Sequence, residues 1–271
     1  MSLLNKKVTL NNGVEMPVLG FGTWKLEEDA VCYDMVTFAL DHGYRHIDTA
    51  QAYHNESSVG RAIRESSVAR EEIFVTSKLS ANTKDYEGSL ERFETTMKET
   101  GLDYLDLYII HAPWKWSDRG GDYSKENIDV WKAMEEIYQS GRVKAIGVSN
   151  FNVEELQNIL DHCTIKPAVN QIYYYAGGTQ DEVVEFCKKH DIAVVGHSPF
   201  GHGKILDHTV LKEMAAKYHR SVPQICIRYC LQKDVYPLPK TSHKEYAVMN
   251  ADVDFEISKE DMILLDQIKH D

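Results

Sequence analysis

Four polar side chains in the first half of the chain have the types and the spacing of a proton-transfer site. Asp48, Tyr53, Lys78 and His111 supply a carboxylate, a phenol, an ammonium group and an imidazole. A phenol has an ordinary pKa of about 10, and a nearby ammonium group lowers it by stabilising the phenolate. We therefore expect Lys78 to lower the pKa of Tyr53, and Asp48 to hold Lys78 in place and keep it charged.

This combination of groups suits the reduction of a carbonyl. His111 can donate a hydrogen bond to a substrate oxygen on which negative charge develops. Tyr53 can protonate the same oxygen while a hydride adds to the carbon. Protein side chains contain no hydride donor, so the chemistry implies a nicotinamide cofactor.

The four residues can converge only if the strands before them are arranged side by side. Parallel strands joined by crossover helices bring all their C-terminal ends to one face of a sheet. Strand-like runs end near residues 22, 47, 77, 110, 148, 171, 195 and 239. Helix-like stretches lie between them at 27–41, 56–68, 86–99, 125–139, 153–162, 180–189 and 222–232, with further pieces at 207–218 and 243–250. The spacing of about 30 residues per unit predicts an α/β fold, a (β/α)8 TIM barrel built as a single domain over residues 1–271.

Local signals refine this prediction. Asn12-Gly13, between two short extended pieces in 8–16, predicts a β-hairpin with a two-residue turn that closes the bottom of the barrel. Asn152 with Glu155, and Thr179 with Glu182, predict capped helix starts. A doubly wound sheet would need GxGxxG after its first strand, and the segment 20–25 lacks the third glycine.

Composition narrows the functional classes. The net charge of −12 argues against a nucleic-acid-binding surface. No apolar run approaches the length of about 20 residues that crosses a bilayer, and residues 1–12 do not read as a signal peptide. The five cysteines form no CxxC pair, and the histidines form no HExxH motif, so we expect free thiols in a reducing cytoplasm and no metal. A cytoplasmic monomer without nucleic-acid or membrane partners is expected.

A series of short motifs runs along the chain in a characteristic order. They are Gly20–Trp24, Arg45–Tyr53, Ser77–Leu79, His111, Gly147–Phe151, Asn170–Gln171, Ser198–Pro199 and Pro239–Thr241. Together they resemble the aldo-keto reductase family, in particular its short prokaryotic-type members, over about residues 8–265. The resemblance implies a metal-free oxidoreductase that reduces aldehydes or ketones with NADPH, or less often NADH, bound across the C-terminal mouth of the barrel.

The resemblance also implies a role for each matching residue. Tyr53 matches the general acid of the family, Lys78 and Asp48 the pair that tunes it, and His111 the residue that orients the substrate. The implied cofactor contacts are Gly22, Thr23, Trp24, Asp48, Ser149, Asn150, Gln171, His197, Ser198, Pro199, Phe200, Gly201, Lys240, Thr241, Ser242, Tyr246 and Asn250.

Those contacts fall into groups along the cofactor. Ser149, Asn150 and Gln171 match the residues that hold the nicotinamide carboxamide, and residues 198–201 match the pyrophosphate-binding loop. Lys240 and Thr241 match the site of the adenosine 2′-phosphate. Asn250 matches an adenine contact.

The chain departs from the family pattern at several positions. His197 stands where a tyrosine usually stacks on the nicotinamide; a charged His197 would make NADP⁺ binding depend on pH, whereas a neutral one would only stack. Tyr246 stands where NADPH-preferring members carry an arginine that forks onto the phosphate, so discrimination against NADH is expected to be reduced. The segment 173–178 lacks the usual His-Pro, which indicates a reshaped loop.

The expected substrate pocket is open and shallow, with walls formed by Trp24, Tyr53, Trp114 and Trp116. Such a pocket favours small aldehydes, dicarbonyls or keto-sugars.

Other functions stay open at this point. A catalytically weak redox sensor or regulatory protein on the same fold would bind NADPH and hardly consume it. A hydrolase would need a GxSxG motif, but Phe200 stands at the position of its last glycine. An isomerase or aldolase barrel would need a phosphate-binding turn late in the chain, for which we find no clear sequence.

Overall fold

The strands form the predicted barrel in the computed structural model, which describes residues 2–269. Eight parallel strands pair in chain order: β3 (Phe21–Gly22), β4 (His46–Asp48), β5 (Phe74–Leu79), β6 (Leu107–Ile110), β7 (Ile146–Ser149), β8 (Val169–Tyr173), β9 (Ala193–His197) and β10 (Val235–Leu238). The backbone N–H groups of Gly20 and Gly22 donate to the carbonyls of Pro237 (3.2 Å) and Pro239 (3.0 Å). These two bonds join the edge strands β3 and β10 and nearly close the barrel.

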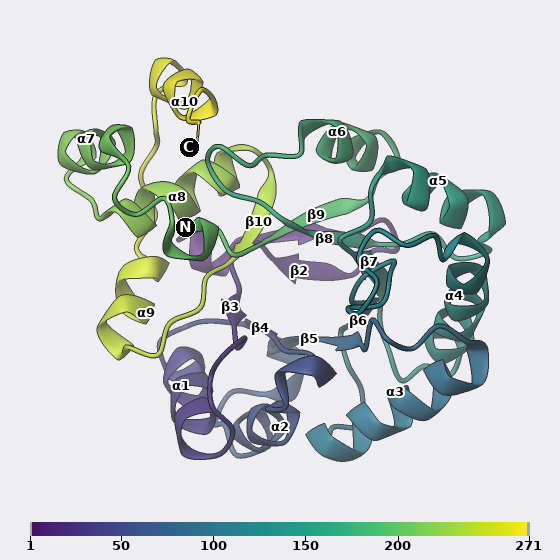
Figure 1. Ribbon diagram of the computed structural model, residues 1–271. Coiled ribbons are helices and arrows are strands. Elements are labelled where there is room, and N and C mark those ends of the chain that lie inside the picture. The colour runs from purple at the N-terminus through teal and green to yellow at the C-terminus, as the bar shows by residue number, and fades with distance from the viewer. Residues whose placement is uncertain (1, 270–271) are drawn as a thin grey trace.

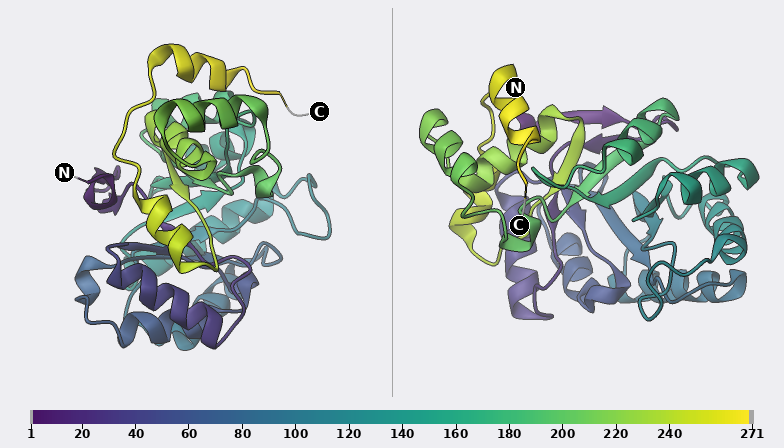
Figure 2. Two further views of the ribbon diagram at one scale, coloured as in Figure 1. Left: turned by 90° about the vertical axis from the view of Figure 1, so that its left-hand side faces the viewer. Right: turned by 45° about the horizontal axis from the view of Figure 1, so that its top comes forward.

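Helices surround the strands, as Figure 1 shows. Their bounds are α1 (Ala30–Asp41), α2 (Glu56–Arg64), α3 (Tyr86–Thr100), α4 (Ser124–Gln139), α5 (Val153–His162), α6 (Asp181–Lys189), α7 (Thr209–Tyr218), α8 (Val222–Gln232), α9 (Lys244–Ala251) and α10 (Lys259–Asp266). Each predicted helix is present, although α2 ends at Arg64 rather than at 68. The last helix, α10, is drawn in yellow and lies outside the green helices of the C-terminal third (Figure 2).

The two predicted helix caps have different outcomes. At α5 the capping box is present, because the Asn152 side chain accepts from the N–H of Glu155 and the Glu155 side chain accepts from the N–H of Asn152. At α6 the prediction is wrong. Gln180 occupies the N-cap in a left-handed conformation (φ 46°), so Thr179 lies one residue outside the cap and caps nothing.

The sheet is buried on both faces, as expected for parallel strands covered by helices. All residues of β5 and β6 are buried. An apolar cluster that includes Leu10, Met16, Leu107 and Val169 fills the lower part of the barrel. This cluster fills the interior at the lower end, so the open space within the barrel lies toward the C-terminal end of the strands.

The N-terminal hairpin closes the bottom of the barrel, as predicted. Strands β1 (Lys7–Thr9) and β2 (Glu15–Pro17) are antiparallel. The side-chain amides of Asn11 and Asn12 donate to the carbonyls of Pro167 and Lys144, which lie just before β8 and β7. These bonds attach the hairpin to the N-terminal ends of the barrel strands.

The turn of this hairpin differs from the prediction. Leu10 and Val14 still pair through a backbone hydrogen bond of 2.8 Å, so the loop contains three residues rather than two. Its last residue, Gly13, has a φ of +86°, and its N–H donates to the carbonyl of Leu10. A three-residue loop of this kind needs a left-handed residue at its end, and Gly13 supplies it one position later than a two-residue Asn-Gly turn would.

Between residues 2 and 269, no helix has the length and apolar character needed to cross a membrane. In the same part of the chain, no group of three or more His, Cys, Asp or Glu side chains is arranged to hold a metal ion.

Candidate active site

The four side chains with which the sequence analysis began meet at the C-terminal end of the barrel. Asp48 is the last residue of β4, Lys78 lies in β5, and His111 directly follows β6. Tyr53 lies on a short 3₁₀ turn, Gln51–Tyr53, after β4. Parallel pairing of β4, β5 and β6 brings these strand ends together.

Lys78 connects two of the others. Its Nζ atom is 2.5 Å from Asp48 Oδ1 and 3.2 Å from Tyr53 Oη, and it also donates to the carbonyl of Thr49 at 2.8 Å. The side chain is completely buried, so each of its three N–H groups needs an acceptor, and each has one. Burial alone would lower the pKa of Lys78, but Asp48 and Tyr53 outweigh it and raise the pKa above its ordinary value. Lys78 is therefore a cation at neutral pH, as expected.

The pKa of Tyr53 departs from the expectation. Lys78 does favour the phenolate, but burial of the phenol is the larger effect and raises the pKa above its ordinary value. The net shift is thus upward rather than downward. A phenol with a raised pKa stays protonated at neutral pH, which is the state required of a proton donor, and Lys78 lies against the oxygen on which negative charge would appear.

His111 is held between aromatic rings at the edge of the same site. Its ring lies 5.6 Å from that of Tyr53 and 5.2 Å from that of Trp116, both in edge-on geometry. Its backbone carbonyl accepts from the side-chain amide of Asn150 at 2.9 Å. Burial, with further contributions from Lys78 and His197, holds the pKa of His111 well below its usual range. The imidazole is neutral at pH 7 and can donate one hydrogen bond.

A second link ties the tetrad to β8. Gln171 donates from its Nε2 atom to Asp48 Oδ2 at 2.8 Å, so Asp48 binds Lys78 with one oxygen and Gln171 with the other. Ser149, at the end of β7, donates from its hydroxyl to the carbonyl of Gln171. The residues that match the carboxamide site are thus bonded to one another and to the proton-transfer group.

A cavity of about 900 Å³ opens above these residues. The predicted site residues that line it are Gly22, Trp24, Asp48, Tyr53, His111, Trp114, Trp116, Ser149, Asn150, Gln171, His197, Ser198, Pro199, Phe200 and Lys240. Its volume is near the upper end of the range for small-molecule sites, about 300–1,000 Å³. One cavity thus brings together the predicted substrate walls and most of the predicted cofactor contacts.

The other predicted residues lie outside this lining: Thr23, Lys78, Gly201, Thr241, Ser242, Tyr246 and Asn250. Thr23 is buried, and its hydroxyl donates to the carbonyl of Asp48, so it supports the tetrad from below. Tyr246 is 51% exposed on α9, whereas Asn250 on the same helix is buried.

Several lining residues were not predicted: Lys25, Ala52, Arg119, Tyr173, His202, Gly203 and Leu238. Tyr173 stacks on His197 (ring centroids 5.5 Å apart) and on His202 (5.0 Å), and His202 packs edge-on against Trp24 (5.2 Å). The missing His-Pro in 173–178 was the one sequence signal for this row of rings. No sequence pattern pointed to Arg119 or His202 as lining residues, because each lies in a loop whose path is defined only in the folded chain.

His197 is held as a neutral ring. Burial, then Lys78 and His202, lower its pKa to about 3. Its Nε2 atom is 3.1 Å from Asn150 Oδ1, an acceptor, so Nε2 carries the proton; its Nδ1 atom faces the Ser198 hydroxyl at 3.3 Å. The geometry therefore favours the neutral stacking role over the charged one.

The residues around the cavity fit a phosphate-bearing dinucleotide. A Cβ atom on Gly22 would approach the carbonyl of Leu238 to 3.1 Å, so glycine lets β3 lie close against the end of β10 at the cavity. Lys25 and Lys240 lie on the lining, and the only acidic residue there is Asp48, which is engaged by Lys78. On a chain with a net charge of −12, this concentrates positive potential where an anionic cofactor would bind.

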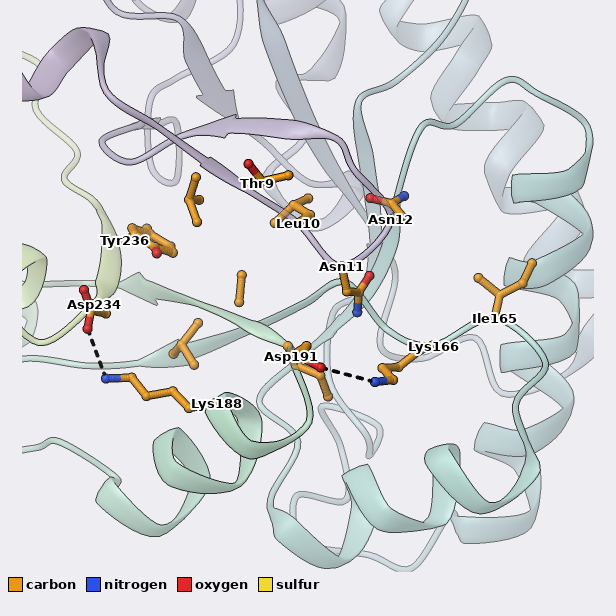
Figure 3. Close-up of a pocket in the computed structure, with 14 residues that line it drawn as sticks. Thr9, Leu10, Asn11, Asn12, Ile165, Lys166, Lys188, Asp191, Asp234 and Tyr236 are labelled. Atoms are coloured by element: carbon orange, nitrogen blue, oxygen red, sulfur yellow. Dashed lines mark hydrogen bonds and ion pairs between the residues drawn. The ribbon is translucent and has the colours of Figure 1, made fainter.

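A second cavity, of about 630 Å³, lies at the opposite end of the barrel beside the N-terminal hairpin. Figure 3 shows that its charged groups form pairs across it, Lys188 with Asp234 (3.5 Å) and Lys166 with Asp191 (4.0 Å). None of the predicted site residues lines it.

Comparison with known proteins agrees with the geometry. The sequence matches the Aldo/keto reductase family over residues 18–270. It is 43% identical over 269 residues to a glyoxal reductase of Bacillus subtilis (strain 168), with 99% of this chain and 94% of that protein covered.

Two solved structures are similar along almost the whole chain. One is MGS-M4, an aldo-keto reductase enzyme from a Medee basin deep-sea metagenome library (39% identity, TM-score 0.90, 97% of this chain and 94% of that chain covered). The other is the silkworm (Bombyx mori) aldo-keto reductase AKR2E5 complexed with NADPH (32% identity, TM-score 0.88, 97% and 88% covered).

Proposed function

Because this chain belongs to the aldo/keto reductase family and is an NAD(P)H-dependent carbonyl oxidoreductase, we propose that it reduces small aldehydes, dicarbonyls or keto-sugars with Tyr53 as the proton donor. The observation that carries this proposal is the position of Lys78, which contacts both Tyr53 Oη and Asp48 Oδ1 at the base of the cavity.

Each member of the tetrad has a distinct task in this proposal. The cofactor, when bound, would supply a hydride for the carbonyl carbon. Tyr53 passes its hydroxyl proton to the carbonyl oxygen, and Lys78 stabilises the phenolate that remains. Asp48 keeps Lys78 charged in its buried position. Neutral His111 donates a hydrogen bond to the same oxygen and so fixes the orientation of the substrate.

The cofactor contacts are also part of the proposal. Ser149, Asn150 and Gln171 would hold the nicotinamide carboxamide, and the ring of His197 would stack on the nicotinamide. Residues 198–201 would bind the pyrophosphate, and Lys240 the 2′-phosphate. The bonds that already connect Asn150, Gln171 and His197 to their neighbours support this assignment, because preorganised groups lose less freedom on binding.

The substrate class is supported by the cavity and by one relative. Trp24, Trp114 and Trp116 provide apolar walls beside Tyr53 and His111. The similarity to a glyoxal reductase supports a small dicarbonyl among the substrates. NADPH is the proposed cofactor, and NADH is accepted as well because Tyr246 cannot fork onto a phosphate as arginine does.

The domain organisation, oligomeric state, location and partners of the protein are proposed from its composition. The chain is proposed to be a single-domain, monomeric enzyme of the cytoplasm, supported by five cysteines that are all free thiols. The acidic net charge of −12 supports a function without nucleic acid.

Oxidation of NADPH and NADH with a panel of aldehydes, dicarbonyls and keto-sugars tests the proposal. Tyr53→Phe should lower kcat by about 10²–10⁴-fold, the usual contribution of general acid catalysis, while the Kd for NADPH changes little. Tyr86→Phe is the matched control, because it removes a phenol hydroxyl on α3, away from the cavity. Tight NADPH binding without turnover on any substrate would contradict the proposal and favour a redox sensor.

A further inference from the structure

An unpaired cation lies on the substrate side of the cavity. Arg119 belongs to the loop 111–123 between β6 and α4 and lines the cavity wall. Its guanidinium carbon lies 5.4 Å from the ring centre of Trp114 and 5.1 Å from that of Trp116. Among residues 2–269 no carboxylate lies within ion-pair distance of this guanidinium, although the chain has 42 acidic residues.

The loop that presents Arg119 is anchored from below. The buried Lys84 donates from Nζ to the carbonyl of Ala112 at 2.8 Å, and the Asn127 side chain donates to the carbonyl of Pro113 at 2.8 Å. The backbone N–H of Trp116 donates to Asn82 Oδ1 at 3.1 Å. These bonds hold the tryptophan platform in place, and the guanidinium lies over it.

Arg119 is close to the reacting groups and separate from the cations on the cofactor side. The ring of Trp116 that it covers is 5.2 Å from the ring of His111, which in turn is 5.6 Å from that of Tyr53. Lys25 lies instead over the ring of Trp24, across the cavity mouth. The cavity therefore has one positive group beside the tryptophans, one of which packs against His111.

We propose that Arg119 binds a carboxylate of the substrate, so that the preferred substrates are short oxo acids whose carboxylate is several carbon atoms from the carbonyl. This inference rests on the proposed function and deepens it. A guanidinium presents a planar fork that matches the two oxygens of a carboxylate, and its cation–π contacts with Trp114 and Trp116 hold it at the cavity wall. One guanidinium also balances the single charge of a carboxylate.

The test compares 4-formylbenzoate with its neutral methyl ester as substrates. Both place the aldehyde and the charged or esterified group at the same separation, and the change in the ratio of their kcat/KM values between wild type and variant isolates recognition of the carboxylate, because the intrinsic reactivities cancel. Arg119→Met should lower the preference for the acid by up to about fivefold, the upper end of the effect of a solvent-exposed ion pair. Arg119→Lys should keep part of the preference, because the charge remains without the fork.

Lys115→Met is the matched control, since Lys115 lies on the same loop but outside the cavity lining, near Tyr123. It should leave the ratio unchanged. In the wild type the preference should fall with added NaCl, and in Arg119→Met it should be insensitive to salt.

Two results would overturn the inference. An acid-to-ester ratio that is equal in wild type and Arg119→Met would show that Arg119 does not recognise the carboxylate. A raised Kd for NADPH in Arg119→Met, measured by quenching of tryptophan fluorescence, would assign Arg119 to the cofactor instead. Absence of turnover with both of these substrates and with the whole panel of aldehydes, dicarbonyls and keto-sugars would contradict the proposed function itself, and so the two failures are distinguishable.

Discussion

Gln171 and Asp48 are 123 positions apart in sequence, yet the side-chain amide of Gln171 donates to Asp48 Oδ2 at 2.8 Å. The other oxygen of Asp48 accepts from Lys78. A residue proposed to hold the cofactor is thus bonded to the carboxylate that controls the charge of the proton-transfer group. The side chain of Gln171 therefore belongs both to the proposed cofactor site and to the hydrogen-bonded group that tunes the proton donor Tyr53.

Asp48→Asn tests this arrangement. The substitution removes the charge that most strongly raises the pKa of Lys78, so that pKa falls. We expect kcat to fall about 100-fold and the basic limb of the pH–rate profile to move to lower pH. Loss of one partner from a buried ion pair should also cost about 3–5 kcal/mol in the free energy of unfolding, measured in urea.

The double variant Asp48→Asn/Lys78→Met separates the two effects. It leaves no uncompensated buried charge, so it should recover part of the stability while its activity stays low. An equal free energy of unfolding for the single and double variants would show that pairing with Asp48 contributes little to the stability of the buried Lys78.

The affinity for cofactor should not depend on the charge of His197. Its pKa of about 3 keeps the ring neutral from pH 5.5 to 8. The 2′-phosphate of NADPH itself titrates near pH 6, so the comparison must be with His197→Phe, which retains a stacking ring. We expect the ratio of the two Kd values to stay constant over this range. A pH-dependent change in Kd that occurs in the wild type but not in His197→Phe would show that His197 becomes charged within this pH range.

Tyr246→Arg should increase the preference for NADPH over NADH. Tyr246 is 51% exposed on α9 and packs beside His243, so an arginine there has room to reach toward Lys240. A bidentate contact with the 2′-phosphate should raise the ratio of kcat/KM values about tenfold. Val248→Arg adds the same charge at another exposed position of α9 (46%) and should leave the ratio near that of the wild type.

The buried Lys84 should make stability depend on pH. Burial lowers its pKa to about 7 in the folded protein, whereas the unfolded chain has the ordinary value of about 10.4. Above pH 7 the unfolded state therefore binds more protons at this residue, and the free energy of unfolding rises with pH. Between pH 7 and pH 9, the free energy of unfolding of the wild type should rise by about 2 kcal/mol relative to that of Lys84→Met, measured by urea denaturation. A difference that stays constant over this range would mean that Lys84 remains charged when folded.

Much of the fold was predictable because its signals are local. Apolar runs of strand length alternating with helical stretches predicted the barrel, and α1 and α4 end at residues 41 and 139 as predicted, shortly before Gly43 and Gly141, both with positive φ. The errors were equally local. At the start of α6, Gln180 took the N-cap position expected for Thr179, and the hairpin turn gained a residue before Gly13.

By itself, the sequence determined the kinds of groups available and the strand ends that carry them: Asp48, Tyr53, Lys78 and His111, together with the motifs of the family. Only the tertiary structure decided how those groups behave. Burial raises the pKa of Tyr53 despite Lys78 and keeps His197 neutral, and no residue type or spacing specifies how far a side chain is removed from water. The positions of Tyr173 and Arg119 on the cavity wall likewise depend on loops and rings from different strands meeting in space.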